Sequence, residues 1–303
     1  MENFALIVVC LLAGVVMLRL RLLPVGSHKS INAWIINLAM PALSLRYVPY
    51  IDWGYEYILP IIGPVLAWVG AVVFVKLYSR FNQIDKATKT AMLLTSALAN
   101  TAFMGLPMIT AFYGAEQLPI AIVFDQVTFL FFSVLGVATL MKATATADMT
   151  HVYRRAVLKT LHFPPFVACM AGLILPHFVD ISPANKLLEM LAATLSPMAL
   201  FSIGMQLRLS GLRGELKHLV AAVGYKLIIA PLIVVLAALA LDVSGNQAKV
   251  STMQASMPTH VTISLLTAEY GQNPNFCTLM VGVSILLSFA TSSLWYTISE
   301  MLF

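Results

Sequence analysis

Residues 95–114 read TSALANTAFMGLPMITAFYG, and this stretch decides how the rest of the chain is interpreted. It is as long as a membrane helix, yet its middle carries Asn100, Thr101, Gly105 and Pro107 among apolar residues. Proline lacks a backbone N–H and leaves the carbonyl four residues earlier without its helical partner, while glycine lets the backbone deviate. Backbone groups freed at membrane depth are tolerated only inside protein or beside a wet cavity. The stretch therefore predicts a broken membrane helix.

A second stretch of the same kind lies late in the chain, where residues 254–260 read QASMPTH. Many secondary transporters build a substrate site from two broken helices near the middle of the membrane. The N-terminal ends of half-helices suit a carboxylate, and Asn100, Thr101 and Thr259 would add neutral donors. The candidate substrate-binding residues are Asn100, Thr101, Gly105, Pro107, Pro258, Thr259 and His260. The alternative is a pair of proline kinks whose polar residues only satisfy the backbone.

The composition indicates a polytopic all-α membrane protein with no separate soluble domain. Only 10% of the 303 residues are charged and 60% are hydrophobic, whereas a soluble domain carries about 25% charged residues. The formal charge of +5 is scattered over short loops, which argues against nucleic-acid binding. The three cysteines are far apart in apolar segments without metal-ligand spacing, so we expect no metal and no cofactor.

Ten apolar segments have about the 17–25 residues that a helix needs to cross a bilayer, although Pro164–Phe178 is short for a crossing. A long polar loop divides them five and five, which gives a first repeat at residues 1–141, a connecting loop at 142–163 and a second repeat at 164–303. The predicted spans are Phe4–Leu20, Ile31–Tyr47, Ile58–Tyr78, Thr90–Tyr113, Leu118–Met141, Pro164–Phe178, Pro183–Leu207, Leu219–Leu241, Lys249–Tyr270 and Phe276–Leu302.

The loops alternate in charge, and every strongly basic loop falls on the same side of the predicted membrane. Because short basic loops stay in the cytoplasm, this pattern predicts a cytoplasmic connecting loop and both termini outside. The acidic start, followed by Arg19 and Arg21 after the first apolar run, argues against a cleavable signal peptide.

An odd number of spans in each half requires the second half to be inserted upside down relative to the first. The halves also resemble each other at a nearly constant offset: Ala111–Gly114 (AFYG) matches Ala268–Gly271 (AEYG), and Pro41 corresponds to Pro197. The sequence therefore predicts two inverted five-helix repeats, with broken fourth and ninth helices that cross.

Asp125, His260 and Lys226 are ionisable residues that lie within predicted spans. Asp125 could couple transport to protons or contact a ligand, or it could occupy a wetted outer position, since it is only ~10 Å along its helix from Leu118. His260 follows the second break and could titrate near neutral pH, or it could simply be hydrogen-bonded. For Lys226 the interpretation is snorkelling toward the cytoplasmic face.

Two more prolines, Pro41 and Pro197, predict bends. Polar and small residues near Pro197 form a strip that either faces the same cavity or packs helices together. These residues are Ser196, Ser202, Gly204 and Gln206. No HExxH, phosphate loop or GxSxG motif occurs in the chain, and no second intramembrane acid accompanies Asp125, so we expect no enzyme.

At these residues the chain resembles the auxin efflux carrier family. The matching pieces are Asn37–Leu43 (NLAMPAL), Ala99–Pro107 (ANTAFMGLP), Pro197–Leu207 (PMALFSIGMQL), Met257–Thr259 (MPT) and Ala268–Gly271. The resemblance implies a fold similar to bile-acid sodium symporters, with a scaffold domain, a transport domain and an elevator mechanism. It also implies small organic anions as substrates: auxin in plants, and carboxylates such as malate or malonate in bacteria.

The chain departs from the plant carriers in two ways. They have a proline where this chain has Ala99, so we expect the break to shift toward Gly105–Pro107. They also carry a long central hydrophilic loop, which this chain lacks. The shorter loop favours a compact bacterial member in the inner membrane, with a substrate other than auxin.

The sequence leaves three functions open. The first is a secondary transporter of small organic anions that works by alternating access. The second is a sodium-coupled symporter of the bile-acid type, for which backbone carbonyls would have to form the ion site. The third is a channel or membrane sensor without turnover. Proton or sodium coupling, substrate identity, transport direction and a homodimer also stay open.

Overall fold

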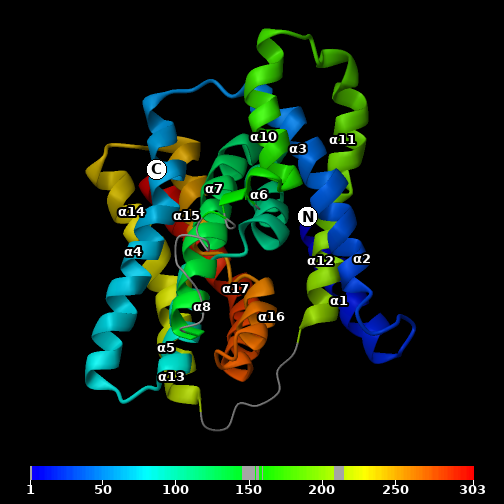
Figure 1. Ribbon diagram of the computed structural model, residues 1–303. Coiled ribbons are helices and arrows are strands. Elements are labelled where there is room, and N and C mark those ends of the chain that lie inside the picture. Colours follow the sequence, from blue (N-terminus) through cyan, green and yellow to red (C-terminus); the bar gives the residue numbers. More distant parts are fainter. Residues whose placement is uncertain (1, 145–153, 155–156, 159, 208–214) are drawn as a thin grey trace. The chain divides into compact units, whose positions relative to one another are not determined.

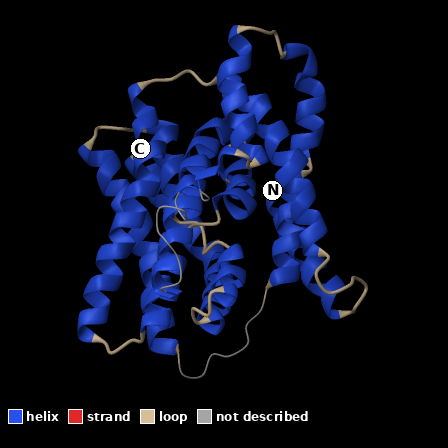
Figure 2. Ribbon diagram, viewed as in Figure 1, coloured by secondary structure: helices blue, strands red, loops and turns tan. Residues whose placement is uncertain are grey.

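The computed structural model describes residues 2–144, 154, 157–158, 160–207 and 215–303, and these residues form helices joined by short loops (Figures 1 and 2). No strand occurs among them apart from one isolated β-bridge, so the predicted all-α class is confirmed for this part of the chain. Residues 145–153 of the predicted connecting loop lie outside the described residues.

Five of the described helices are long and apolar enough to cross a membrane. They are Tyr55–Phe81, Ala115–Ala143, Ser182–Gln206, Leu216–Ala240 and Pro274–Leu302. Each covers one of the ten predicted spans, and shorter apolar helices occur at Phe4–Arg19, Thr101–Tyr113 and Pro164–His177. The full set of ten spans and their inverted arrangement stay predictions.

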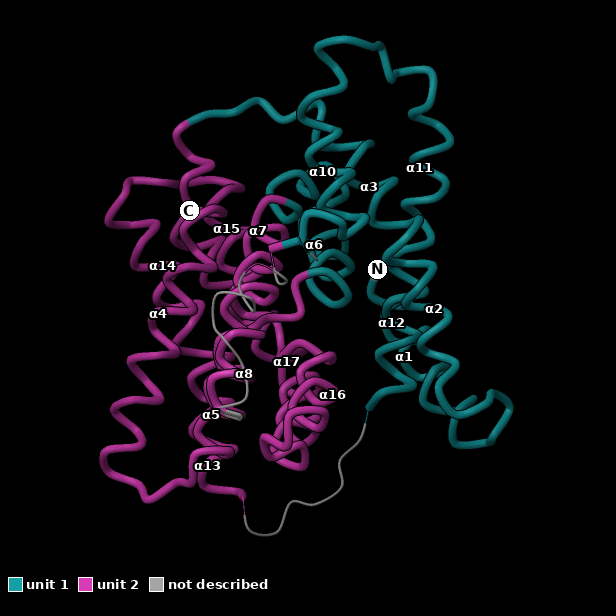
Figure 3. Tube along the Cα trace, viewed as in Figure 1, with its two compact units in different colours: residues 1–54, 102–122, 158–207 teal, residues 55–101, 123–157, 208–303 magenta. Residues whose placement is uncertain are grey.

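The described chain divides into two units, each assembled from three segments (Figure 3). The first unit contains residues 1–54, 102–122 and 158–207, and the second contains residues 55–101, 123–157 and 208–303. Each unit takes segments from both halves of the chain. The units and the predicted repeats are therefore two different divisions of the protein.

In the first unit, α1 (Glu2–Arg19) packs along α12 (Leu195–Gln206), and α3 (Met40–Tyr47) packs against α10 (Pro164–Ile174) and α11 (Asn185–Ala193). Its other elements are α2 (His28–Trp34), η1 (Ile35–Ala39), η2 (Val48–Tyr50), α6 (Leu106–Tyr113), η5 (Ala115–Gln117), η7 (Leu175–His177) and η8 (Ser182–Ala184).

The contact between α1 and α12 depends on two glycines that face each other. A Cβ atom added to Gly14 would collide with the backbone carbonyl of Phe201, and one added to Gly204 would collide with the carbonyl of Leu11. Small residues let helix backbones approach closely where lipid removes the hydrophobic drive for helix pairing. Gly204 therefore serves helix packing, which was one of the two interpretations of its polar strip.

In the second unit, α4 (Ile58–Phe81) packs beside α5 (Lys86–Ala97), α14 (Ala230–Ala240) and α15 (Gly245–Ala255). The other elements that lie wholly in this unit are η3 (Tyr55–Tyr57), η6 (Phe132–Gly136), α8 (Val137–Thr144), α13 (Leu216–Gly224), η9 (Tyr225–Ile229), α16 (Thr262–Glu269) and α17 (Pro274–Leu302). Two elements run across the division of the chain, η4 (Thr101–Gly105) and α7 (Leu118–Phe131).

Polar caps hold the ends of two helices in the second unit. The Asp85 carboxylate caps α5 by accepting hydrogen bonds from the Thr88 N–H (2.9 Å) and hydroxyl (2.7 Å), and these bonds lower the pKa of the Asp85 carboxyl. Asn273 caps α17 by accepting the Phe276 N–H, and its amide donates to Thr88 (2.8 Å) and Glu215 (3.1 Å). Asn273 thus joins the beginnings of α5, α13 and α17.

Three helices contain a π-helical turn that ends two residues before a proline. These turns are η1 before Pro41, η4 before Pro107 and η9 before Pro231. A proline inside a helix removes one hydrogen bond and its ring clashes with the carbonyl four residues earlier. The wider turn relieves that clash without ending the helix. Pro41 and Pro107 thus alter the winding of their helices rather than unwinding them.

The carbonyl that Pro231 displaces finds a partner on another helix. It belongs to Leu227, and it accepts a hydrogen bond of 2.8 Å from the indole N–H of Trp295 on α17. Trp295 is buried, so no water can replace this donor.

We therefore expect Trp295→Phe to destabilise the protein by about 1–3 kcal/mol, the cost of leaving a buried carbonyl without a partner. Thermal unfolding of the purified protein would measure the loss. Trp53→Phe is the matched control, because Trp53 is half exposed. Equal changes for the two variants would show that the indole hydrogen bond contributes nothing.

Candidate functional site

The two broken helices pair through their backbones where their unwound segments meet, a place that we call the crossing. Helix α5 ends at Ala97 and α15 ends at Ala255, and a short unwound segment follows each of them. Ala99 and Thr259 form an antiparallel β-bridge there. The Asn100 N–H donates to the Pro258 carbonyl (2.8 Å), and the His260 N–H donates to the Leu98 carbonyl (3.1 Å). Each unwound segment thus satisfies backbone groups of the other.

The first break lies at residues 98–100, so the expected shift toward Gly105–Pro107 is wrong. Gly105 ends the π-helical turn η4 and Pro107 lies in the first turn of α6, both within continuous helix. The physical reason lies in the tertiary structure. The backbone pairing with the second break holds residues 98–100 open without a proline at position 99. Gly105 and Pro107 belong to the first unit, whereas the pairing described above lies within the second.

Pro258 lies in the second break as predicted, but the Gln254 carbonyl is not left free. It accepts a hydrogen bond of 3.3 Å from the Met257 N–H, which tightens the last turn of α15. The unwound segment follows this turn. Pro258 itself acts through its carbonyl, which accepts the Asn100 N–H.

Thr259 stabilises the crossing. Its hydroxyl donates to the Thr95 carbonyl near the end of α5 (2.7 Å), and its N–H donates to the Ser284 hydroxyl on α17 (3.1 Å). Both bonds lie in the buried interior of the second unit. The Thr259 donors are therefore engaged in holding the break. Ser284 is a supporting residue that no motif in the sequence singled out.

Asn100 lies at the crossing with an unsatisfied side chain. The residue is fully buried, and neither the oxygen nor the nitrogen of its amide has a hydrogen-bond partner among the described residues. Burying an amide without hydrogen bonds costs free energy, and such groups are rare in proteins. This side chain is therefore a free donor and acceptor at the point where the two broken helices meet.

Thr101 and Asp125 form a buried pair. The Thr101 hydroxyl donates to the Asp125 carboxylate over 2.6 Å, and the Gln126 amide lies 3.4 Å from its second oxygen. Asp125 is only 5% exposed, which argues against the alternative of a wetted outer position. The acid therefore contacts the residue that follows Asn100 in the chain.

His260 is half-buried at the end of the second break. Its ring stacks on Phe132 with a centroid distance of 5.1 Å, and its Nδ1 accepts the Thr262 N–H (3.2 Å) at the start of α16. The acceptance by Nδ1 leaves Nε2 as the protonated nitrogen in the neutral ring. The imidazole thus helps to begin the half-helix α16.

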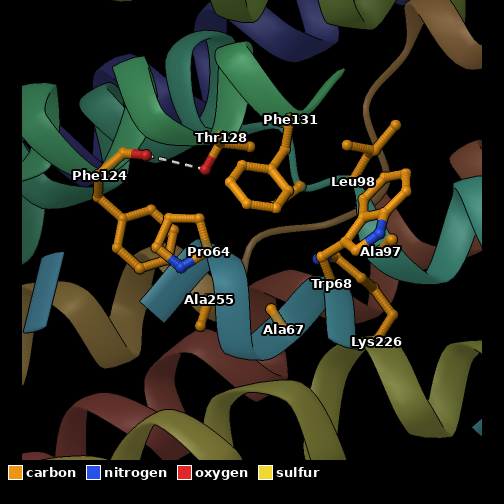
Figure 4. A pocket seen from close by; sticks show the side chains of 11 residues that line it. Pro64, Ala67, Trp68, Ala97, Leu98, Phe124, Thr128, Phe131, Lys226 and Ala255 are labelled. Carbon is orange, nitrogen blue, oxygen red and sulfur yellow. Dashed lines mark hydrogen bonds between the residues drawn. The ribbon is translucent and has the colours of Figure 1, made fainter. Parts of the chain in front are cut away.

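Lys226 is not a snorkelling side chain, which corrects the sequence-based interpretation. It is fully buried, and its helix begins at Leu216, about 15 Å earlier at 1.5 Å per residue. Its side chain lines a small cavity together with Ala97 and Leu98, where α5 ends, and Ala255, where α15 ends (Figure 4). Ala99 of the first break also lines this cavity. The position of Lys226 well inside its predicted span was the sequence feature that could have identified it as a buried charge.

Comparison with known proteins identifies the family of this chain. The sequence profile of the membrane transport protein family matches residues 1–296. An "Uncharacterized transporter" of Methanothermobacter thermautotrophicus is 24% identical over 298 residues, which cover 97% of this chain and 96% of that protein. A protein of Rhizobium meliloti named "Putative malonate transporter" is 25% identical over 277 residues, 86% of this chain and 83% of the relative.

The matched residues include both breaks, and they extend over nearly the whole chain. The resemblance to auxin efflux carriers drawn from the motifs is therefore confirmed. The chain belongs to the membrane transport protein family.

Proposed function

We propose that this protein is a secondary transporter that moves small organic anions by alternating access. The observation that carries the proposal is the buried amide of Asn100, which has no hydrogen-bond partner among the described residues and lies at the crossing of two broken helices. Transporters place substrates where half-helices meet at unwound backbone. The Asn100 amide can donate to a carboxylate, and α16, which begins just after the second break, presents the positive end of its dipole.

The substrate class that we propose is a small carboxylate or dicarboxylate. The resemblance to auxin efflux carriers supports an organic anion, and the relative named for malonate supports a short dicarboxylate. Malonate is therefore the first probe to use. The membrane orientation follows the charge pattern, with both termini outside and the chain in the plasma membrane.

An elevator mechanism is part of the proposal. It needs a part of the chain that carries the site and a part that serves as scaffold. The paired breaks, Asn100 and the Thr101–Asp125 pair all lie within the second unit. That unit is our candidate for the transport domain, and the first unit is the candidate for the scaffold.

Counterflow in liposomes tests the function directly. Vesicles containing the purified protein are loaded with unlabelled malonate and diluted into a trace of labelled malonate. A carrier accumulates label transiently above the external concentration, because each return step exchanges one anion for another. A channel or a sensor cannot do this. Accumulation only in the presence of sodium would favour the symporter, and no accumulation with any short carboxylate would reject the proposal.

Proton coupling, if the protein uses it, should depend on Asp125 or His260. Both can change charge at the crossing without leaving a permanent charge in an apolar environment. We expect Asp125→Asn to flatten the pH dependence of malonate uptake, since the amide cannot take up the proton that the carboxylate carries. His260→Gln tests the second candidate in the same assay. If both variants keep the wild-type pH profile, these residues do not couple transport to protons.

A further inference from the structure

A fully buried lysine lies beside the crossing and has no ionic partner in the part of the chain that the structure describes. The Nζ atom of Lys226 makes no hydrogen bond to any described residue, and no acid is among the residues that line its cavity (Figure 4). A buried ammonium without a partner is costly, and intramembrane charges usually mark function. The proposed substrate site at Asn100 does not include this residue.

The protein holds Lys226 in place on both sides. The preceding residue, Tyr225, donates its hydroxyl hydrogen to the Ala67 carbonyl on α4 (2.8 Å). The following residue, Leu227, accepts the Trp295 indole N–H. Lys226 itself belongs to the π-helical turn η9, a kind of turn that is frequent at functional sites. The backbone that carries the ammonium is therefore fixed by contacts with two other helices.

The C-terminal ends of two helices, which carry partial negative charge, form part of the cavity wall. This wall contains Ala97, the last residue of α5, and Ala255, the last residue of α15. Each helix C-terminus carries about half a negative elementary charge from its aligned peptide dipoles. Two such ends favour a positive charge between them. Lys226 is the charged residue that the described part of the chain places there.

The cavity beside Lys226 is too small to hold a carboxylate. Its volume is about 10 Å³, which is roughly the room that one water molecule needs. In transporters with broken helices, the C-terminal ends of half-helices and unwound carbonyls commonly coordinate a sodium or hydrogen ion. In this chain the Lys226 side chain lies at the position where such an ion would bind.

We propose that Lys226 is a built-in cation of the crossing, whose charge replaces that of a coupling sodium ion and balances the bound organic anion. This inference rests on the proposed function, because it assumes an anion at the crossing. It separates the two transport mechanisms that the sequence leaves open. A protein with its own cation at this place needs no sodium ion to attract a carboxylate.

The first test uses the unmodified protein. We expect malonate to bind the purified wild type with the same affinity, within about twofold, when sodium chloride is exchanged for potassium chloride or choline chloride. A requirement for sodium in the wild type would overturn the inference while leaving the proposed transport function intact. Failure of malonate and other short carboxylates to bind or exchange at all would reject both.

The second test removes the charge. Lys226→Met and Lys226→Ala should each weaken malonate binding by about tenfold or more. Methylammonium should restore binding to Lys226→Ala, since the truncated side chain leaves space for a small cation, and bulky tetramethylammonium should not. Lys249→Met is the matched control, because Lys249 pairs with Glu300 (2.9 Å) outside this cavity.

Two outcomes of the second test would contradict the inference. Wild-type affinity in Lys226→Met would show that the charge is not used. A loss of affinity in Lys226→Ala that methylammonium does not restore would show that the side chain acts through packing alone. Thermal unfolding of each variant identifies any that fail to fold, and in that case the exchange of sodium for potassium in the wild type decides the question.

Discussion

Replacing Asn100 by aspartate should abolish detectable malonate binding, whereas replacing it by alanine should weaken binding by about tenfold to a hundredfold. Alanine removes one hydrogen bond to a charged ligand, which is worth about 1.5–3 kcal/mol. Aspartate removes the donor and also places a negative charge where the anion must bind. In the buried interior that repulsion is poorly screened.

Which of the two variants binds malonate more weakly distinguishes a binding role of Asn100 from a structural one. If Asn100 only supports the backbone at the break, aspartate should be the milder change, because it keeps the shape and can still accept hydrogen bonds. Titration calorimetry with malonate on folded protein would measure both affinities. Asn82→Asp is the matched control, since Asn82 lies in the loop after α4 and bonds to the Tyr78 carbonyl. Equal affinity for wild type and both Asn100 variants would place the substrate elsewhere.

The second large effect should come from the glycine contact between α1 and α12. In the middle of an isolated helix, alanine is more favourable than glycine by about 1 kcal/mol. At Gly204, however, an added methyl group would meet the backbone of α1, which cannot move aside as a flexible side chain could. We therefore expect Gly204→Ala to destabilise the protein by about 1–3 kcal/mol or more, as overpacking does in other interiors.

The matched control for this prediction is Gly224→Ala in α13, where a Cβ atom would meet no atom within 4 Å. That variant should be neutral or stabilising. Gly14→Ala should resemble Gly204→Ala, and the double variant should cost less than the sum because both changes separate the same two helices. Thermal unfolding in detergent measures all four proteins. A stabilised Gly204→Ala variant would mean that α1 and α12 do not pack through these glycines.

The sequence by itself determined the class of the protein. The low charge content and the repeated apolar segments required a helical membrane protein, because only such helices satisfy their own backbone in lipid. The residues at both breaks, such as Asn100 and Pro258, were visible as polar and helix-breaking types inside apolar segments. The motifs around them led to the family that the comparison confirmed.

Only the tertiary structure decided where the first helix unwinds and what its polar residues do. Pro107 was the local signal for a helix break, but a π-helical turn accommodates it. The helix unwinds at Ala99 instead, because a segment distant in the sequence pairs with it there. For the same reason, the sequence did not reveal the partner of Thr259, nor that the Asn100 amide has no partner among the described residues. Lys226 looked like a residue that reaches water, since a sequence shows how far a charge lies from a helix end but not what surrounds it. Contacts between segments 68 to 164 residues apart fix these features, and no local pattern encodes such contacts.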